Sequence, residues 1–275
     1  MTAPHVIAVV LNWRDAPSTA VCVASLLAED GVASVVLVDN ESTGELRALA
    51  GDRVTLIEQP DNLGFSRGVN VGLRHALSLG ADAALVINND ATLEPHAFAA
   101  MVDAWQEHGG RAGLIAPIVR YADGTLQSSG GRVRGIDAAT DDLVGAARAN
   151  YLTWACVLVP RATLEEVGLL DERFFMYWED VDYGLRVLDA GRELVVAEHA
   201  TVIHEKSKSH ARAGVAIEKY SARGLVILAR THRGTLLYSG LPVRTAARVL
   251  KRIIQGRPAH ARAVVEGVIE GWRAE

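Results

Sequence analysis

Short apolar runs alternate with helix-length segments along the first 120 residues, and this alternation constrains the fold more than any other feature. The runs are rich in Val, Leu, Ile and Ala and lie at Val6–Leu11, Val35–Val38, Val54–Glu58, Ala83–Ile87 and Leu114–Val119. Helical spacing is found between them, at Ser18–Glu29, Gly68–Leu79 and Pro95–His108. Strands that are apolar on both faces and separated by helices are typical of a parallel sheet covered on both sides. The sequence therefore predicts an α/β protein with a mostly parallel, Rossmann-like sheet.

The composition is that of an ordinary globular protein of one large or two small domains, with 275 residues, 49% hydrophobic and 22% charged. Cys22 and Cys156 lie far apart in apolar stretches, so we expect them to be buried as small hydrophobic side chains. The first apolar run is too short to span a membrane and lacks the features of a secretory signal. A cytoplasmic location is expected on these grounds.

Charge is distributed unevenly between the two ends of the chain. Residues 1–210 carry 16 Lys and Arg against 29 Asp and Glu, whereas residues 211–275 carry 12 against 4. The acidic body argues against a nucleic-acid partner, and the basic tail favours an anionic one.

Polar residues follow three of the predicted strands directly. They are Asn12, the pair Asp39-Asn40, and the triplet Asn88-Asn89-Asp90. Ligands of open α/β sheets bind beyond the carboxyl ends of the strands, so these residues are candidates for a site. Ordinary turn formation by Asn and Asp is the alternative explanation for any one of them.

The two common phosphate-binding signatures are missing. The turn after the first strand, LNWRDAPST, has no glycine, and no GxxxxGK[ST] sequence occurs in the chain. A nucleotide diphosphate would therefore need another partner, for which a divalent cation held by carboxylates is the obvious alternative.

The second half of the chain is less regular. Residues 124–150 are expected to form a mobile loop or irregular insert, followed by a strand at Tyr151–Val159 and a helix at Val181–Leu188. Between these, five acids lie among five aromatic residues in GLLDERFFMYWEDVDYGLRV. Glu179 and Asp180 fall at the start of the helix, where capping alone would account for them. Their aromatic neighbours favour a surface that binds a sugar and accepts a proton.

Several of these motifs together carry a resemblance. VVLNW, VDNES, DNLGFSRGVNVGL, NND and GLLDERFFMYWEDVDYGLRV resemble, in order and spacing, the motifs of the family 2 inverting glycosyltransferases, in particular the rhamnosyltransferase-like branch. The resemblance covers roughly residues 5–210. It implies a GT-A fold, a nucleotide-diphospho-sugar donor such as dTDP-rhamnose or a UDP-sugar, a divalent cation (Mn²⁺ or Mg²⁺), and transfer with inversion to an acceptor hydroxyl.

The resemblance also implies residue roles. Asp180 matches the catalytic base, with Glu179 beside it, and Asp90 and His204 match metal ligands, although Asn88 replaces the first acid of the family's DxD motif. Trp154, Tyr177 and Trp178 are expected to meet the acceptor; Trp154 stands where relatives have Gly, and either narrows the pocket or packs against the insert. The expected nucleotide-sugar contacts are Asn12, Arg14, Asp39, Asn62, Gly64, Phe65, Asn70, Asn88 and Asn89.

The last 65 residues are expected to form a separate helical extension. We divide the chain into a catalytic domain, residues 1–210, and basic amphipathic helices in residues 211–275, at Ile217–His232, Val243–Gln255 and Ala259–Trp272. Such helices lie in membrane interfaces or bind acidic partners, so peripheral membrane contact through residues 241–273 is one interpretation. A lid on the body and a homodimer surface are the others. The acceptor can accordingly be a glycan, a lipid-linked molecule or a small molecule.

Two other functions compete with glycosyl transfer. A sugar-1-phosphate nucleotidyltransferase would need a glycine-rich basic loop after the first strand, which LNWRDAPST does not supply. A non-catalytic nucleotide-sugar-binding protein would not need both Asp90 and Asp180. The sequence therefore favours the transferase.

Overall fold

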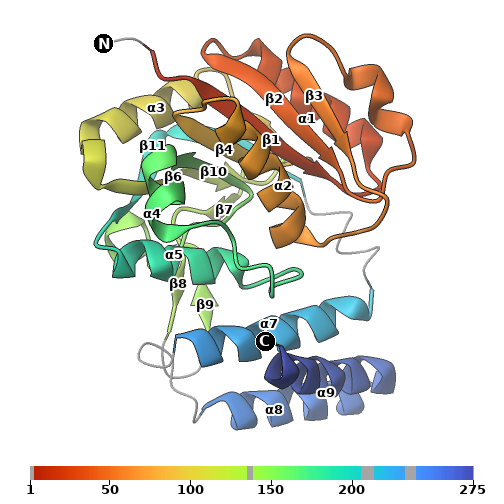
Figure 1. The fold of residues 1–275 in the computed structure, drawn as a ribbon. Helices are drawn as coiled ribbons and strands as arrows, with labels where there is room; N and C mark the ends of the chain where they lie inside the picture. Colours follow the sequence, from red (N-terminus) through yellow and green to blue (C-terminus); the bar gives the residue numbers. More distant parts are fainter. Residues whose placement is uncertain (1–2, 135–138, 206–213, 233–239, 275) are drawn as a thin grey trace.

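The core of the structure is a mixed β-sheet with helices on both faces (Figure 1). This computed structural model describes residues 3–134, 139–205, 214–232 and 240–274. Among these residues, nine strands form one sheet in the order β3-β2-β1-β4-β10-β6-β11-β5, with β7 beside β6. They are β1 Val6–Asn12, β2 Val32–Asp39, β3 Val54–Glu58, β4 Ala83–Asn88, β5 Ala91–Leu93, β6 Ala112–Arg120, β7 Leu126–Ser128, β10 Cys156–Pro160 and β11 Glu193–His204.

The predicted parallel arrangement is confirmed for β3, β2, β1 and β4, and β11 is also parallel to β6. The rest of the sheet is antiparallel, because β10 runs against both β4 and β6, and the short β5 against β11. The strand predicted at Tyr151–Val159 was placed too early. Tyr151 makes only an isolated bridge to Gly131, and continuous pairing begins at Cys156.

Two hydrophobic cores lie on opposite faces of the sheet. Helices α1 (Ala16–Ala28) and α3 (Ala97–His108) cover one face, and both cysteines are buried there as free thiols, as predicted. The other face is covered by α2 (Phe65–Ser78), α4 (Arg161–Val167) and α5 (Glu179–Asp189). The first turns of α2 and α5 lie at the edge of the sheet where β1, β2 and β4 end.

Helix α2 approaches the sheet unusually closely. A Cβ atom built on Gly72 would lie 2.3 Å from Val9 Cγ1, and one on Gly68 would lie 2.6 Å from Leu11 Cδ1. Glycine is required here for the separation between helix and sheet, which brings the loop before α2 down to the ends of β1 and β2.

The predicted insert at residues 124–150 is partly ordered rather than wholly irregular. Strand β7 extends the sheet, and β8 (Arg132–Val133) pairs with β9 (Thr140–Asp141). Asn150 fastens the hairpin by exchanging two hydrogen bonds with the Val133 backbone, at 2.8 and 2.9 Å.

The three predicted C-terminal helices are confirmed within two or three residues, as α7 (Ala216–Thr231), α8 (Gly240–Ile254) and α9 (Pro258–Arg273) (Figure 1). Helix α7 packs on the body, where Leu225 and Leu228 meet Phe174 and Trp178 in a third hydrophobic cluster. Helix α9 packs on α7 through Gly267, whose added Cβ would lie 2.2 Å from the Lys219 carbonyl oxygen. In the described part of the chain, no helix is long and apolar enough to cross a membrane.

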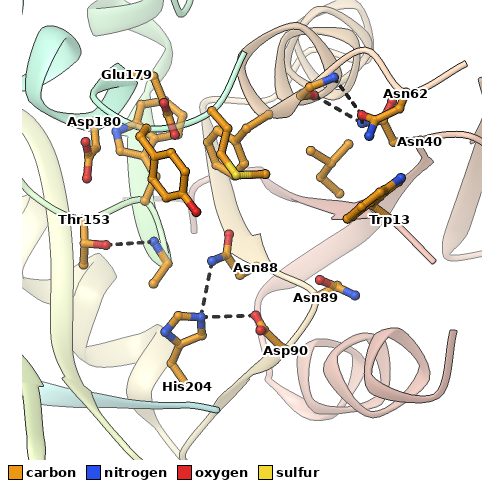
Figure 2. Close-up of a pocket in the computed structure, with 17 residues that line it drawn as sticks. Trp13, Asn40, Asn62, Asn88, Asn89, Asp90, Thr153, Glu179, Asp180 and His204 are labelled. Atoms are coloured by element: carbon orange, nitrogen blue, oxygen red, sulfur yellow. Dashed lines mark hydrogen bonds and ion pairs between the residues drawn. The ribbon is translucent and has the colours of Figure 1, made fainter. Parts of the chain in front are cut away.

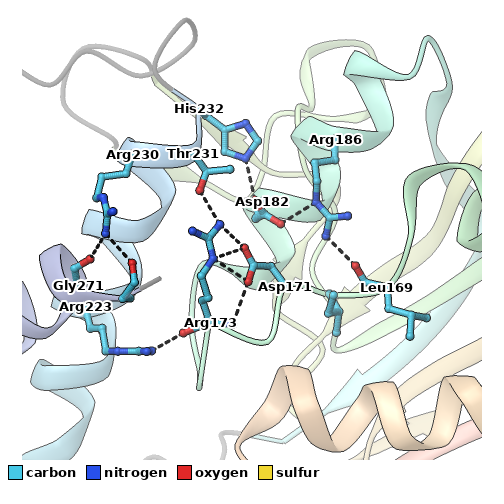
Figure 3. A network of polar contacts seen from close by, with 12 residues as sticks. Leu169, Asp171, Arg173, Asp182, Arg186, Arg223, Arg230, Thr231, His232 and Gly271 are labelled. Atoms are coloured by element: carbon cyan, nitrogen blue, oxygen red, sulfur yellow. Dashed lines mark hydrogen bonds and ion pairs between the residues drawn. The ribbon is translucent and has the colours of Figure 1, made fainter.

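A buried ionic network also joins α7 to the body (Figure 3). Asp182 on α5 is inaccessible to solvent and accepts hydrogen bonds from Arg186 Nε and His232 Nε2, each at 2.8 Å. Arg173, paired with Asp171, donates to Thr231 near the end of α7. Helix α7 therefore shares both a hydrophobic cluster and this network with residues before 210. The division of the chain into two domains at residue 210 stays a prediction.

The close approach of α2 gives a stability prediction. Gly72→Ala should lower the free energy of unfolding by about 1–3 kcal/mol through overpacking against Val9. In an open helix the same change would be favourable by about 1 kcal/mol. Gly110→Ala is the control, because a Cβ there meets no atom within 4 Å. Denaturant unfolding measures both variants, and an equal effect would contradict close packing at Gly72.

Candidate functional site

A cavity of about 260 Å³ opens at the carboxyl ends of β1, β2 and β4, where the sequence placed the site (Figure 2). Its far wall is made by the loop before β10, the first turn of α5, and His204 at the end of β11. The structure brings together eleven of the predicted site residues around it: Asn62, Gly64, Phe65, Asn88, Asn89, Asp90, Trp154, Tyr177, Glu179, Asp180 and His204.

Four residues predicted to meet the nucleotide do not line this cavity: Asn12, Arg14, Asp39 and Asn70. Asn12 and Asp39 are buried behind it, where Asn12 Nδ2 donates to Asp39 Oδ1 at 2.7 Å. Arg14 forms an ion pair with Glu41 at 2.5 Å. Trp13, which the sequence did not single out, lines the cavity and donates through Nε1 to the same Glu41. Nucleoside contacts by Asn12, Asp39 and Arg14 stay predictions.

The loop Asn62–Gly64 is shaped by Asn40, whose amide nitrogen donates to Asn62 Oδ1 at 3.0 Å and to the Gly64 carbonyl. Gly64 has φ 80°, and an added Cβ would lie 2.5 Å from the Phe175 carbonyl oxygen. The Phe65 amide donates to that oxygen at 2.6 Å. The loop is thereby locked against the segment that leads into α5.

Asn70 is buried beneath the loop, and its contact with the nucleotide stays a prediction. Its side chain is inaccessible to solvent and makes two hydrogen bonds to the Leu170 backbone, donating at 2.8 Å and accepting at 3.1 Å. Glu172 reinforces this junction with ion pairs to Arg67 and Arg74 on α2. The NLGFSRGVN segment thus holds the acidic segment in place as well as lining the cavity.

The side chains of Asp90 and His204 face each other across the cavity floor (Figure 2). Asp90 Oδ1 and His204 Nε2 are 3.1 Å apart, and Asn88 Nδ2 lies 3.4 Å from the same nitrogen. His204 Nδ1 lies 3.1 Å from Gln127 Oε1, which can only accept a hydrogen bond. We assign the proton to Nδ1 on this ground, which leaves the Nε2 lone pair directed at Asp90.

This arrangement fits a divalent cation. His204 Nε2 and Asp90 Oδ1 lie 3.1 Å apart, close to the separation of about 3.0 Å between neighbouring ligand atoms that are each about 2.1 Å from a shared octahedral ion. Gln127 would be the outer partner that orients the histidine. No cluster of three or more His, Cys, Asp or Glu ligands occurs among the described residues, so further ligands would come from substrate or water.

The two central carboxylates lie in the first turn of α5, as predicted. Two consecutive aromatic residues, Tyr177 and Trp178, directly precede the helix and have φ of 72° and 75°. Such conformations cost free energy in non-glycine residues and are found at functional sites. Trp178 is held by its Nε1, which donates to the Ser221 carbonyl of α7 at 2.9 Å.

Burial makes both carboxylates poor acids. Burial and the charge of Asp180 raise the pKa of Glu179 well above its ordinary value, and Glu179 Oε2 has no hydrogen-bond partner. Burial raises the pKa of Asp180 to about 6; the Val181 amide opposes this rise and the charge of Asp142 adds to it. Near neutral pH Asp180 is therefore mostly ionised and able to accept a proton.

Asp180 also lines a second cavity, which shares Thr153 and Tyr177 with the first. The predicted acceptor residue Trp178 lies here rather than in the first cavity. Trp154 lines only the first cavity, where its ring packs edge-on against Tyr183 at 5.1 Å. Sequence reasoning missed the other lining residues from the insert and α7, since no motif marks them: Gln127, Ser128, Thr140, Asp142, Tyr151 and Ser221.

Comparison with known proteins agrees with this geometry. Residues 3–223 match the family model described as "Glycosyltransferase like family 2". The chain is 31% identical over 237 residues to an N-acetylglucosaminyl-diphospho-decaprenol L-rhamnosyltransferase of Mycobacterium tuberculosis, covering 74% of this chain and 77% of that protein. It is 26% identical over 193 residues to the hexosyltransferase Agl10 of low-salt glycan biosynthesis in Haloferax volcanii, covering 66% and 62%.

Solved structures share the fold at low identity. A mannosyltransferase from Pyrobaculum calidifontis, in complex with GDP-Man and Mn²⁺, has a TM-score of 0.63 at 15% identity and covers 100% of this chain and 89% of that one. GalNAc-T7 with UDP, GalNAc and Mn²⁺ has a TM-score of 0.65 at 12% identity and covers 83% and 48%. The fold is therefore GT-A, and the chain belongs to glycosyltransferase family 2 as a nucleotide-sugar-dependent glycosyltransferase.

Proposed function

We propose that this protein is a metal-dependent inverting glycosyltransferase in which Asp180 is the base. The observation that carries the proposal is the position of Asp180, whose side chain borders both cavities and stands beside their shared residues. The first cavity would hold the donor, with its diphosphate toward Asp90 and His204. The second would hold the acceptor, so that its hydroxyl meets the donor next to Asp180.

The transfer is a single displacement. The acceptor oxygen forms a bond to the anomeric carbon while the bond from that carbon to the diphosphate breaks, and the hydroxyl proton passes to Asp180. General-base assistance of this kind is worth about 10²–10⁴-fold in rate. Burial and the charge of Asp180 raise the pKa of Glu179 well above its ordinary value, which disfavours two adjacent carboxylate charges in the site.

Asp90 and His204 would hold the cation, with Mn²⁺ or Mg²⁺ as the candidates. When bound, it neutralises the charge that develops on the departing diphosphate. Asn88 stands where the family's DxD motif has its first acid, so the motif carries one negative charge fewer. The Asn88 side-chain amide lies 3.4 Å from His204 Nε2. The solved GT-A structures with Mn²⁺ support this proposal.

The rhamnosyltransferase relative bears on donor and acceptor. By analogy with its name, we propose a deoxyhexose or hexose donor such as dTDP-rhamnose or a UDP-sugar, and an acceptor linked to a lipid through diphosphate. An enzyme that uses such an acceptor works at a membrane surface, and residues 241–273 are the part of the chain proposed to meet it.

The base assignment gives the first functional prediction. Asp180→Asn should reduce transfer by about 10²-fold or more, because the amide cannot take the proton. Donor affinity, measured by calorimetry, should change little. Asp189→Asn is the control, since Asp189 is exposed at the other end of α5. Activity of Asp180→Asn within about tenfold of the parent would reassign the base to Glu179.

The raised pKa of Asp180 predicts an acidic limb in the pH profile. A base with a pKa of about 6 is ionised above that pH, so kcat/KM should fall as the pH drops through about 6. Asp142→Asn removes a negative charge that raises this pKa, and it should move the limb to lower pH. A limb that stays in place or moves upward would show that it does not report Asp180.

The metal proposal predicts that chelation stops transfer and that added Mn²⁺ or Mg²⁺ restores it. His204→Ala should raise the metal concentration needed for half-maximal rate by about tenfold or more, because one protein ligand is lost. His199→Ala is the matched control, since His199 lies on the same strand but is exposed. Full activity in excess chelator would remove the cation from the mechanism.

A further inference from the structure

Helix α8 exposes apolar side chains to solvent and packs on the protein through its basic face, the reverse of a usual surface helix. Four of its apolar side chains point to solvent: Val243 is 71% exposed, Leu250 57%, Ile253 56% and Ile254 76%. Together with the exposed Ala246 and Ala247 they fall at helical spacing and so form one face. Amphipathic helices of globular proteins bury this face instead. The helix lies at the edge of the molecule, beyond α7 from the sheet (Figure 1).

The basic face of α8 is the one that docks. Arg248 and Arg252 both pair with Glu218 of α7, at 2.7 and 2.5 Å, and Glu218 is only 5% exposed. Arg244 lies over the Trp178 ring at 5.8 Å. These three arginines therefore do not face outward from α8. They contact Glu218 and Trp178 within the protein, whereas the apolar face of α8 is exposed to solvent.

The charged residues of α8 itself, and of the turn that follows it, are all positive. No Asp or Glu occurs between Glu218 and Glu266, and Lys251, Arg257 and Arg262 are exposed beside or just after α8. An apolar strip with cations at its border matches the surface of an anionic bilayer, where apolar side chains enter below the headgroups and the cations meet phosphate.

A second copy of the chain fits this face poorly. A helix of 15 residues is about 22 Å long and about 10–12 Å wide, so its face offers roughly 250 Å², against about 800 Å² per partner in a standard interface. A twofold contact would also bring two acid-free cationic helices together. Charge and area both favour lipid as the occupant.

We propose that α8 is a membrane-docking helix whose apolar face, Val243, Leu250, Ile253 and Ile254, lies in the surface of an anionic bilayer. The arginines of its opposite face fix it to α7 and so hold that apolar face outward. The proposal rests on the proposed function only in that a lipid-linked acceptor explains why the enzyme needs a membrane.

Vesicle flotation with the full chain tests it. The parent should float with vesicles of phosphatidylcholine and phosphatidylglycerol, and more weakly with phosphatidylcholine alone. Ile253→Ser with Ile254→Ser should weaken partitioning by about tenfold or more, because two exposed side chains lose their apolar burial in lipid. Val21→Ser is the matched control, a 59% exposed apolar residue on α1. Equal binding by the double variant, or no binding by the parent, would overturn the proposal.

A label reports the contact directly. Both native cysteines are buried, so Ile254→Cys can be labelled selectively with an environment-sensitive fluorophore. Its emission should shift to the blue on adding anionic vesicles, whereas a label at Val21→Cys should not respond. Light scattering gives the alternative outcome: a parent dimer that the double serine variant converts to monomer, without vesicle binding, would assign the face to a second copy.

Neither measurement uses donor or acceptor. Asp180→Asn should therefore bind vesicles as the parent does while transferring no sugar. If the parent transfers sugar but does not bind vesicles, the docking helix is rejected and the transferase proposal stands. If it binds vesicles but transfers no sugar, the transferase proposal is rejected and the docking helix stands.

Discussion

The segment between Leu170 and Trp178 is anchored by backbone hydrogen bonds from distant parts of the chain, and the site depends on this anchoring. The Asn70 side chain forms two hydrogen bonds with the Leu170 backbone. The Phe65 amide donates to the Phe175 carbonyl, and the Trp178 indole donates to the Ser221 carbonyl. These contacts join α2, the acidic segment and α7. They hold Tyr177 and Trp178 in left-handed conformations that isolated residues of these types avoid. The carboxylates of α5 therefore enter the cavity from a fixed position.

Anchoring of this kind allows the site to keep charges that burial disfavours. The surrounding protein raises the pKa values of Glu179 and Asp180 by shielding them from bulk water, and Glu179 Oε2 has no hydrogen-bond partner. One turn later, Asp182 is more deeply buried but is paired with both Arg186 and His232. The same helix thus carries one acid that is paired with two cationic side chains and secures the fold, and two acids without such partners that line the cavity. The contrast separates the structural carboxylate from the pair proposed to react, although all three lie within four residues.

Much of this could be predicted from the sequence, because strand and helix periodicity and the polar strand ends have direct physical causes. The direction of β10 could not be predicted, since an apolar run looks the same in parallel and antiparallel pairing. Motif residues were harder to assign: Asn70 and Gly64 support the loop geometry, and a sequence motif does not separate that role from ligand contact. The second cavity was missed because the insert that builds it has no periodicity. For α8, amphipathicity was evident, but which face is buried depends on Glu218 of another helix.

Helix α7 connects the chemistry to the outer helix. Its Ser221 lines the second cavity, accepts the Trp178 indole through its carbonyl, and accepts from Arg248 of α8 through its hydroxyl at 3.2 Å. One turn earlier, Glu218 binds two arginines of α8. The surface proposed to meet lipid is therefore only one helix away from the cavity proposed to receive the acceptor. The acidic body would be kept away from the anionic bilayer, since charge repulsion and the docking helix favour the same orientation.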